Sequence, residues 1–316
     1  MSPGRVLVTG GAGFIGSHVC ERYLSDGWDV TALDDLSTGR RENVPSGVDL
    51  VHMDVRAPEV RDLFADRRFD VVNHHAAQID VRTSVADPWL DASINLGGLL
   101  NLLQSSVEFG LERFVFISSG GVVYGEPSEL PTPRSAPKRP LSPYGVSKLS
   151  SEFYLQATRE LHGLEYAALR YSNVYGPRQD PHGEAGVVAI FCQHLLEGES
   201  LTVFGDGEQT RDYVFVKDVA AANLLVTHAE LPPDGGLDSV AFNVGRSMET
   251  SVNDLAGTLM EVSGTEVPLH HEAARPGELL RSSLDCAETV ELGWSPSYSL
   301  LDGLRETYES IAGATA

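Results

Sequence analysis

The chain has 316 residues, of which 42% are hydrophobic and 22% charged, a balance typical of globular proteins large enough to bury a substantial core. Its formal net charge of −22 at pH 7 disfavours nucleic acid as a partner, because an acidic surface repels the phosphate backbone. The sequence shows no apolar run of about 18 residues and no signal-peptide pattern, so we expect a cytoplasmic protein that does not enter a membrane.

Lysine and cysteine usage lead to two further expectations. Of the 23 basic residues only three are lysines, namely Lys138, Lys148 and Lys217. An acid-rich, lysine-poor surface suits a high-salt cytoplasm, but a GC-rich genome would also favour arginine over lysine, and both explanations stay open. The cysteines have no paired spacing, which predicts buried free thiols rather than disulfides or metal ligands. They are Cys20, Cys192 and Cys286.

Short apolar segments alternate with helical patterns through the first half of the chain. The segments with the composition of buried parallel strands are 6–9, 30–33, 50–53, 71–73, 114–117 and 167–170. The helical patterns between them are 13–24, 60–65, 95–109 and 143–162. This alternation predicts an α/β fold built on a doubly wound parallel sheet.

The composition of the chain changes after residue 176, where proline, glycine and charged residues become frequent. We expect a strand at 241–244 that rejoins the main sheet, and helices at 187–196, 252–262, 287–292 and 300–310. The prediction is a main domain of residues 1–173 plus about 212–248, and a smaller mixed α/β substrate lobe of about 174–211 plus 249–316.

A glycine-rich loop over residues 9–16 follows the first predicted strand and opens a helix. Gly10, Gly13 and Gly16 would allow a tight turn, a close approach to a pyrophosphate and helix–sheet packing. The helix start at Phe14 and Ile15 adds backbone amides and the positive end of a helix dipole. With a strand before it and a helix after it, the loop predicts a dinucleotide-binding Rossmann domain.

The second predicted strand ends in Asp34 and Asp35, with Asp34 18 residues beyond Gly16. An acid at this point accepts hydrogen bonds from the adenosine ribose and repels a 2′-phosphate, which favours NAD over NADP. NADP remains an alternative cofactor, because the nearby Arg40 and Arg41 could accommodate its 2′-phosphate.

Further side chains near the strand ends have more than one interpretation. Asp54 and Val55 follow the third strand, where a loop could cover the adenine, although Asp54 could instead cap a helix. The pairs His74–His75 and His270–His271 have no further ligand at metal-site spacing, so we expect core or surface histidines and no metal.

Tyr144 and Lys148 lie four residues apart on the predicted helix 143–162, so they share one face. A phenol is a poor base at its ordinary pKa near 10, but an adjacent ammonium favours the phenolate. The strand 114–117 runs into Ser118 and Ser119, and a hydroxyl there could share the hydrogen bond to a reacting substrate oxygen. The sequence therefore predicts a catalytic site made of Tyr144, Lys148 and one of these two serines.

Together these features resemble the extended short-chain dehydrogenase/reductase family, in particular its UDP-glucose 4-epimerase branch, over nearly the whole chain. The further matching motifs are 75–78, Asn95, 169–178, 203–207, 211–214 and 275–278. One position departs from the pattern, because Gly120 stands where many relatives have Ser or Thr. We therefore assign the catalytic hydroxyl to Ser119, with Ser118 as the alternative.

The resemblance implies a set of contacts to NAD and to a UDP-sugar. The NAD set is Gly10, Gly13, Phe14, Ile15, Gly16, Asp34, Asp35, Ser37, Asp54, Val55, Ala76, Ala77, Gln78, Asn95, Ser118, Tyr144, Lys148 and Tyr171. The substrate set is Ser119, Tyr144, Asn173, Val187, Val188, Thr202, Val203, Phe204, Arg211, Arg275 and Glu278. In it Arg211 and Arg275 would clamp the diphosphate, and Phe204 would lie against the uracil unless it is a core aromatic. Relatives pair helices 95–109 and 143–162 across an axis, so a homodimer is also implied.

The implied reaction is 4-epimerisation of UDP-glucose and UDP-galactose through a transient 4-keto sugar, with N-acetyl or uronic acid forms as variants. The first alternative is a 4,6-dehydratase, but the acid pair that dehydration needs is replaced by Gly120–Gly121. Decarboxylation of UDP-glucuronate is disfavoured as well, because this chain has no extra acid at the same place. An NAD-sensing regulator without activity is the alternative from another class, and the intact Tyr144–Lys148 pair argues against it.

Three residues bear on the choice of sugar. Ser282 occupies a position where a bulky residue in some relatives excludes N-acetyl sugars, so a serine would leave room. Arg178 and Arg281 could meet a C6 carboxylate, or could be surface or phosphate-binding arginines.

Overall fold

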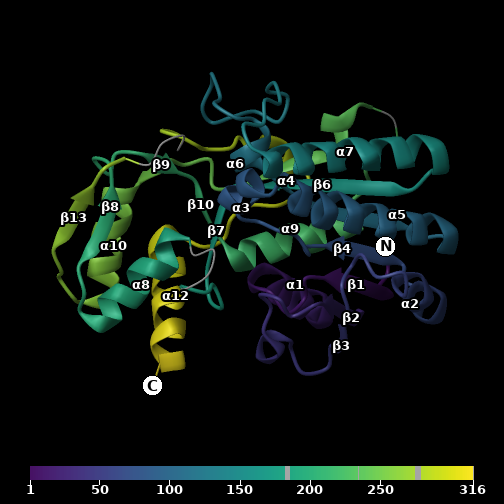
Figure 1. The fold of residues 1–316 in the computed structure, drawn as a ribbon, viewed down its shortest axis with the longest axis horizontal. Coiled ribbons are helices and arrows are strands. Elements are labelled where there is room, and N and C mark those ends of the chain that lie inside the picture. Colours follow the sequence, from purple (N-terminus) through teal and green to yellow (C-terminus); the bar gives the residue numbers. More distant parts are fainter. Residues whose placement is uncertain (182–185, 234, 275–278, 316) are drawn as a thin grey trace.

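Seven parallel strands form the central sheet of the computed structural model, which describes residues 1–181, 186–233, 235–274 and 279–315. The strand order is β11-β6-β5-β4-β1-β2-β3, and every pairing in it is parallel (Figure 1). The strands are β1 Arg5–Thr9, β2 Asp29–Asp34, β3 Asp49–His52, β4 Val71–His74, β5 Arg113–Ser119, β6 Glu165–Tyr171 and β11 Ala241–Val244. The predicted doubly wound sheet is confirmed. Its order reverses between β1 and β4, the point at which such sheets bind ligands.

Alternate side chains of each strand face two layers of helices, as β1 shows. Val6 and Val8 pack on the side of helices α1 (Phe14–Ser25) and α9 (Val216–His228). Leu7 packs on the opposite side. The helices there are α2 Val60–Arg67, α5 Gly98–Phe109 and α7 Pro143–His162. Because both faces are covered, the strands are apolar on both sides, which explains their uninterrupted apolar sequence.

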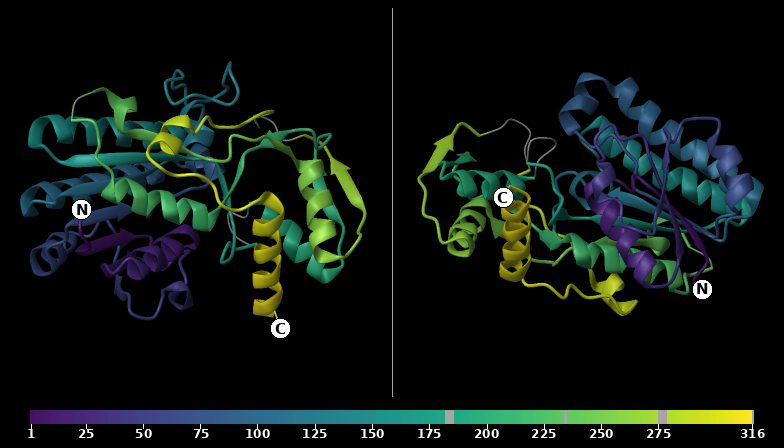
Figure 2. Two further views of the ribbon diagram at one scale, coloured as in Figure 1. Left: turned by 180° about the vertical axis from the view of Figure 1, so that it is seen from behind. Right: turned by 90° about the horizontal axis from the view of Figure 1, so that it is seen from below.

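A separate hydrophobic cluster forms a smaller lobe beside the carboxyl ends of the strands. Its helices are α8 Val187–Glu197, α10 Val252–Ser263 and α12 Leu300–Thr315, grouped apart from the large sheet in both views of Figure 2. Its main ladder joins β8 (Leu201–Phe204) to β13 (Leu269–Glu272) in parallel. Two short ladders connect it to the sheet domain, β7 Asn173–Tyr175 with β10 Tyr213–Phe215, and β9 Thr210–Arg211 with β12 Thr250–Ser251. The mixed α/β character expected for the lobe is confirmed.

Several elements differ from the sequence-based expectations. Helix α9 was not predicted, because it is buried on most of its surface, between the sheet and its neighbours, and so lacks a clear amphipathic pattern; it packs on β5 and β6 beside α1. The expected helix 95–109 starts as a π-helical turn, Ser93–Gly97, before α5, and the C-terminal helix continues to Thr315. The short helical elements that were also missed are η1 Arg41–Asn43, α3 Val81–Ala86, α4 Pro88–Ala92, α6 Gly120–Val123 and η3 Leu237–Val240. The short strands β7 to β10, β12 and β13 were missed as well. Helix α11 spans Ala287–Glu291, one residue shorter than expected.

The three cysteines are buried free thiols, as their spacing predicts. Among the helices of the described ranges, none combines the length and the apolarity that crossing a membrane requires.

Candidate active site

The glycine loop turns directly from β1 into α1, in a geometry that side chains would obstruct. Gly10 has φ +68°, and a Cβ there would lie 2.7 Å from the backbone nitrogen of Ala76. A Cβ on Gly16 would lie 2.1 Å from the carbonyl oxygen of Gly10. Helix α1 starts at Phe14 without a side-chain cap, so its first amides are left for a ligand. The loop is therefore a cradle that fits a pyrophosphate.

The end of β2 supplies the acid expected beside the adenosine ribose. Asp34 is buried and accepts hydrogen bonds from the backbone amides of Ala12 (2.9 Å) and Leu36 (2.8 Å). Burial raises the pKa of its carboxyl group. Asp35 is exposed and accepts from the amide and hydroxyl of Ser37. Asp34 thus fixes the glycine loop to β2 and keeps an acidic group where the sequence predicts the adenosine ribose.

Asp54 and Val55, which follow β3, have different surroundings. Asp54 pairs with Arg56 and does not cap α2, whose N-cap is Glu59, so the capping alternative is wrong. Val55 is buried against Gly98, where a Cβ would lie 2.6 Å from its side chain.

The segment after β4 is held in place by Asn95. The Asn95 side chain accepts from the Gln78 amide and donates to the Gln78 carbonyl, both at 3.0 Å. The Ala76 amide donates to the hydroxyl of Thr9 at the end of β1. Residues 75–78, including Ala77, thus run along the crevice between β1 and β4, and Asn95 acts on them through Gln78.

Histidines at this crevice are core groups. His74 shares a 2.7 Å hydrogen bond with Thr9, and burial lowers the pKa of His75 to about 3, so His75 is neutral at pH 7. Its Nε2 is buried without a partner, as expected of an atom that a bound ligand would satisfy. Within the described ranges no cluster of three potential metal ligands occurs. His270 and His271 lie on β13 and are exposed.

Tyr144 and Lys148 project from the first turns of α7. Ser142 caps this helix by accepting from the Gly145 amide at 3.1 Å, and Pro143 occupies its first turn, which explains why the helix begins where the sequence predicts. The Lys148 ammonium lies 5.8 Å from the centre of the Tyr144 ring and donates to the Ile117 carbonyl at 2.9 Å. Burial lowers the pKa of Lys148 to about 8, while the carboxylates of Asp91 and Glu152 oppose this shift. A buried cation therefore stands beside the phenol.

The two serines at the end of β5 have different surroundings. Ser118 is 1% exposed and donates to Glu152 at 2.5 Å. Ser119 lines a cavity of about 310 Å³. The geometry therefore favours Ser119 over Ser118 as the hydroxyl that meets a substrate. Gly120 follows at once, where a Cβ would lie 2.5 Å from the Leu284 side chain, so packing explains the glycine that departs from the family pattern.

The cavity brings together residues from both parts of the fold. Its wall is formed by Val81, Ser119, Gly121, Val122, Gly125, Leu141, Ser142, Ser172, Asn173, Arg211, Leu279 and Ser282. Ser119, Asn173 and Arg211 are members of the predicted substrate set. Ser172 was missed, although it directly precedes Asn173, because a serine in a strand-end motif carries no distinctive signal. Its hydroxyl oxygen is buried without a hydrogen-bond partner in the structure.

Other predicted substrate residues lie deeper in the small lobe. Val188 and Val203 are buried in its core, and Val187 packs against that core. Thr202 and Phe204 alternate with the buried residues of β8 and are partly exposed, so Phe204 is not a fully buried core aromatic. Arg275 and Glu278 lie outside the described residues.

Three polar residues make contacts that limit their roles. Tyr171 is buried, with its hydroxyl 2.5 Å from the side-chain nitrogen of Asn223. Arg178 pairs with Glu21 and donates to Ser17 of α1. Arg281 pairs with Glu249. Both arginines therefore already have carboxylate partners.

A Rossmann sheet with a glycine cradle, a ribose-side acid and a Tyr–Lys helix beside a second lobe defines a dinucleotide-dependent enzyme of the short-chain dehydrogenase/reductase type. Residues 6–245 match the NAD dependent epimerase/dehydratase family, and the chain belongs to this family. NAD is accordingly its cofactor.

Individual relatives match over almost the whole chain. A UDP-glucose 4-epimerase of Mycolicibacterium smegmatis is 43% identical over 311 residues, covering 96% of this chain and 97% of the relative. The crystal structure of the Thermotoga maritima UDP-glucose 4-epimerase with UDP-glucose has a TM-score of 0.94 and 42% identity, covering 99% of this chain and 100% of that one. The Thermus thermophilus UDP-glucose 4-epimerase in complex with NAD has a TM-score of 0.91 and 43% identity, covering 98% and 99%.

Proposed function

We propose that this protein is a UDP-sugar 4-epimerase that interconverts UDP-glucose and UDP-galactose. The observation that carries the proposal is the Tyr144–Lys148 pair on α7 beside the cavity that Ser119, Asn173 and Arg211 line. The similarity to UDP-glucose 4-epimerases over nearly the full chain supports it.

In this reaction Tyr144, as phenolate, takes the proton of the sugar C4 hydroxyl. The Lys148 ammonium favours the phenolate by its charge, and Ser119 donates to the reacting oxygen. NAD, when bound, supplies the acceptor for the C4 hydride and gives it back later. The sugar would turn while Arg211 holds the diphosphate, so that the opposite face of C4 meets the returning hydride. Tyr144 gives its proton back to the C4 oxygen, and the overall reaction consumes no oxidant.

Because the cofactor is regenerated in each cycle, NAD can remain bound, and contacts around the glycine loop support tight retention. The loop after β7 reaches back to α1, where the Pro177 carbonyl lies 3.0 Å from the His18 ring and Arg178 pairs with Glu21. Asp180 pairs with Arg40 at 2.9 Å. These contacts close the small lobe against the NAD-binding helix. They also engage Arg40, one of the two arginines that had left NADP open as the cofactor.

For the sugar, the cavity wall favours a neutral hexose and leaves room for a C2 substituent. Ser282 lines the cavity as a small residue, so N-acetyl sugars fit the proposal as additional substrates. A C6 carboxylate would find Arg178 and Arg281 already paired, so uronic acids are less favoured.

We further propose a homodimer formed through the outward faces of α5 and α7 and of the neighbouring α4. Large apolar side chains are exposed on α4 and α7, with Trp89 82%, Phe153 57% and Val146 49% accessible. An apolar surface of this kind on neighbouring helices marks a protein interface, and a two-fold axis would let it pair with itself.

The test is incubation with separate UDP-sugars, followed by NMR of the sugar protons without added cofactor. UDP-galactose should yield UDP-glucose, and Tyr144→Phe should keep bound NAD but lower kcat by roughly 100-fold or more. Formation of a 4-keto-6-deoxy sugar would instead identify a dehydratase. Bound NAD without turnover of any UDP-sugar would indicate a regulator.

A further inference from the structure

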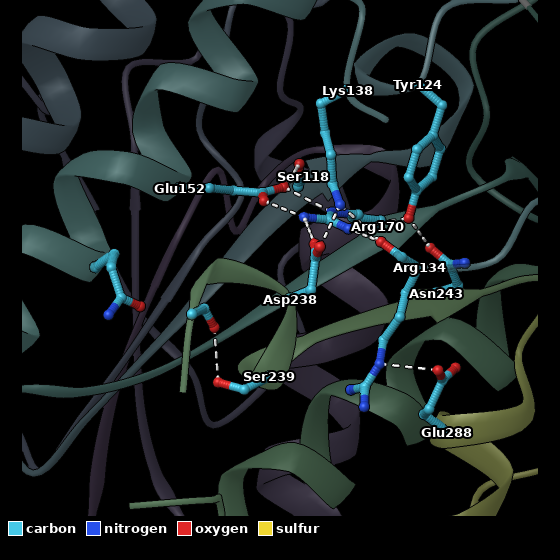
Figure 3. A network of polar contacts seen from close by, with 12 residues as sticks. Ser118, Tyr124, Arg134, Lys138, Glu152, Arg170, Asp238, Ser239, Asn243 and Glu288 are labelled. Atoms are coloured by element: carbon cyan, nitrogen blue, oxygen red, sulfur yellow. Dashed lines mark hydrogen bonds and ion pairs between the residues drawn. The ribbon is translucent and has the colours of Figure 1, made fainter. Parts of the chain in front are cut away.

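A buried polar network starts at Ser118, the residue that directly precedes the cavity residue Ser119 on β5 (Figure 3). Its first member is Ser118, which donates to Glu152 Oε1 at 2.5 Å. In the ladder between β5 and β6, Ser118 stands opposite Arg170 and Ser119 stands opposite Tyr171. The carboxylate of Glu152 therefore sits over the two neighbouring strand ends and binds a side chain from each.

Arg170 makes this arrangement rigid, because an acceptor is present for each of its five N–H donors. Nε donates to Glu152 Oε1 at 3.0 Å, and Nη2 donates to Glu152 Oε2 at 2.6 Å and to Asp238 at 2.9 Å. Nη1 donates to the Tyr124 hydroxyl and the Arg134 carbonyl, both at 3.0 Å. Arg170 and Glu152 are both fully buried, so water does not compete for these bonds.

Glu152 also belongs to the helix that carries the catalytic pair. It lies four residues beyond Lys148 and eight beyond Tyr144, so all three project from one side of α7. Lys148 donates to the Ile117 carbonyl while Glu152 accepts from Ser118, so α7 is bonded to two successive residues of β5. The residue that follows them is Ser119. The distance between Ser119 and Tyr144 is thus set by two bonds that join their supporting elements.

The network continues to the loop that enters α7. Asp238 pairs with Lys138 at 2.5 Å, and the Tyr124 hydroxyl donates to Asn243 at 2.7 Å. Lys138 lies in the segment that leads to Leu141 and Ser142 on the cavity wall. The network therefore anchors both the strand end and the loop that border the cavity.

We propose that Glu152 and Arg170 are positioning residues of the epimerase, which act through Ser118 to hold the Ser119 hydroxyl in register with Tyr144. The proposal rests on the proposed function. Neither residue is exposed to the cavity, so each acts on the reaction through the Ser118–Ser119 segment rather than by touching the substrate. Misplacing a catalytic group by a fraction of an ångström lowers the rate without weakening the binding of the nucleotide.

The test is a double-mutant cycle on the holoenzyme with UDP-galactose as substrate. Ser118→Ala leaves the Glu152–Arg170 pair intact and should lower kcat roughly 10-fold with KM nearly unchanged. In a Ser119→Ala background the same change should have little effect, because the hydroxyl it positions is gone. Equal losses in both backgrounds, or an unchanged kcat, would overturn the proposal.

Two further variants separate positioning from general destabilisation. Glu152→Gln keeps an oxygen that can accept from Ser118 and should lose less kcat than Glu152→Ala. The matched control is Ser106→Ala, which removes another buried serine hydroxyl, bonded to the Leu102 carbonyl in α5, and should leave kcat unchanged. A wild-type chain without turnover would contradict the proposed function itself, whereas additive losses in an active enzyme contradict only the positioning role.

Discussion

Lys148 is the residue whose charge the proposed chemistry depends on most. It is buried, and the titratable groups around it are the carboxylates of Asp91 on α4 and Glu152 on α7, with the neutral His74 at the end of β4 and the neutral His75 just after it. Burial lowers its pKa to about 8, so the ammonium is present at neutral pH and is lost within the alkaline range of an ordinary assay.

We therefore predict that kcat is level near neutral pH and falls above about pH 8, as Lys148 loses the proton that favours the Tyr144 phenolate. The measurement is a pH profile of kcat at saturating UDP-galactose. Lys148→Arg should have a lower kcat but keep its alkaline limb level to higher pH, because a guanidinium stays charged. An alkaline limb that is the same in both proteins would argue against Lys148 as its source.

Ser282 lines the cavity that we propose holds the sugar. It lies on the cavity wall, so a larger side chain there projects into the substrate space. Ser282→Tyr should reduce turnover of UDP-N-acetylglucosamine by roughly 100-fold or more through steric exclusion, and should affect UDP-glucose much less. The measurement is the ratio of kcat/KM for the two sugars. Ser282→Ala is the control, and an unchanged ratio in the Ser282→Tyr variant would refute the role of this position in sugar selection.

At the scale of elements, the sequence predicted those whose signals are local. Helix α7 begins and ends as expected, since Ser142 and Pro143 mark its start and Gly163, with φ +73°, marks its end. Helix α9 escaped prediction because burial on most of its surface removes the amphipathic pattern. The π-helical turn before α5 depends on contacts such as that of Asn95 with Gln78, which join separate segments.

The candidate site divides in the same way. The glycine loop and the Tyr144–Lys148 pair are contiguous motifs and could be found by spacing alone. The Glu152–Arg170 pair and the unpartnered hydroxyl of Ser172 depend on the register of β5, β6 and α7, which no local pattern encodes. The exact division into two lobes, and the roles of individual site residues, stay predictions.

The outer faces of α4, α5 and α7 allow a test of the proposed homodimer. Phe153 is 57% exposed on α7, and a charge at the centre of a self-pairing apolar surface meets its own copy across the axis. Phe153→Glu should shift the protein from dimer to monomer in light scattering coupled to gel filtration. Val290→Glu, on the exposed side of α11, is the matched control and should not change the mass. A wild-type monomer, or a dimer in both variants, would contradict this interface.

For the whole molecule, the dominant feature is the net charge of −22. Self-repulsion of this size destabilises the compact state, and salt screens it, with a Debye length of about 10 Å at 0.1 M and about 3 Å at 1 M. We predict that the Tm rises by several degrees between about 0.1 M and 2 M KCl. The comparison with equally concentrated sucrose, which does not screen charge, isolates the electrostatic part. A Tm that does not change in molar salt would argue against adaptation to a high-salt cytoplasm and leave a GC-rich genome as the explanation of the arginine-rich, lysine-poor composition.

The central claim is that one buried site oxidises and re-reduces the same sugar carbon. UDP-galactose that carries deuterium at C4 tests it most directly, with the holoenzyme, no added NAD, and NMR of the product. The account predicts UDP-glucose with the deuterium retained at C4, because the hydride that leaves the sugar is the one that returns. Loss of the label from C4, or no UDP-glucose at all, would contradict it.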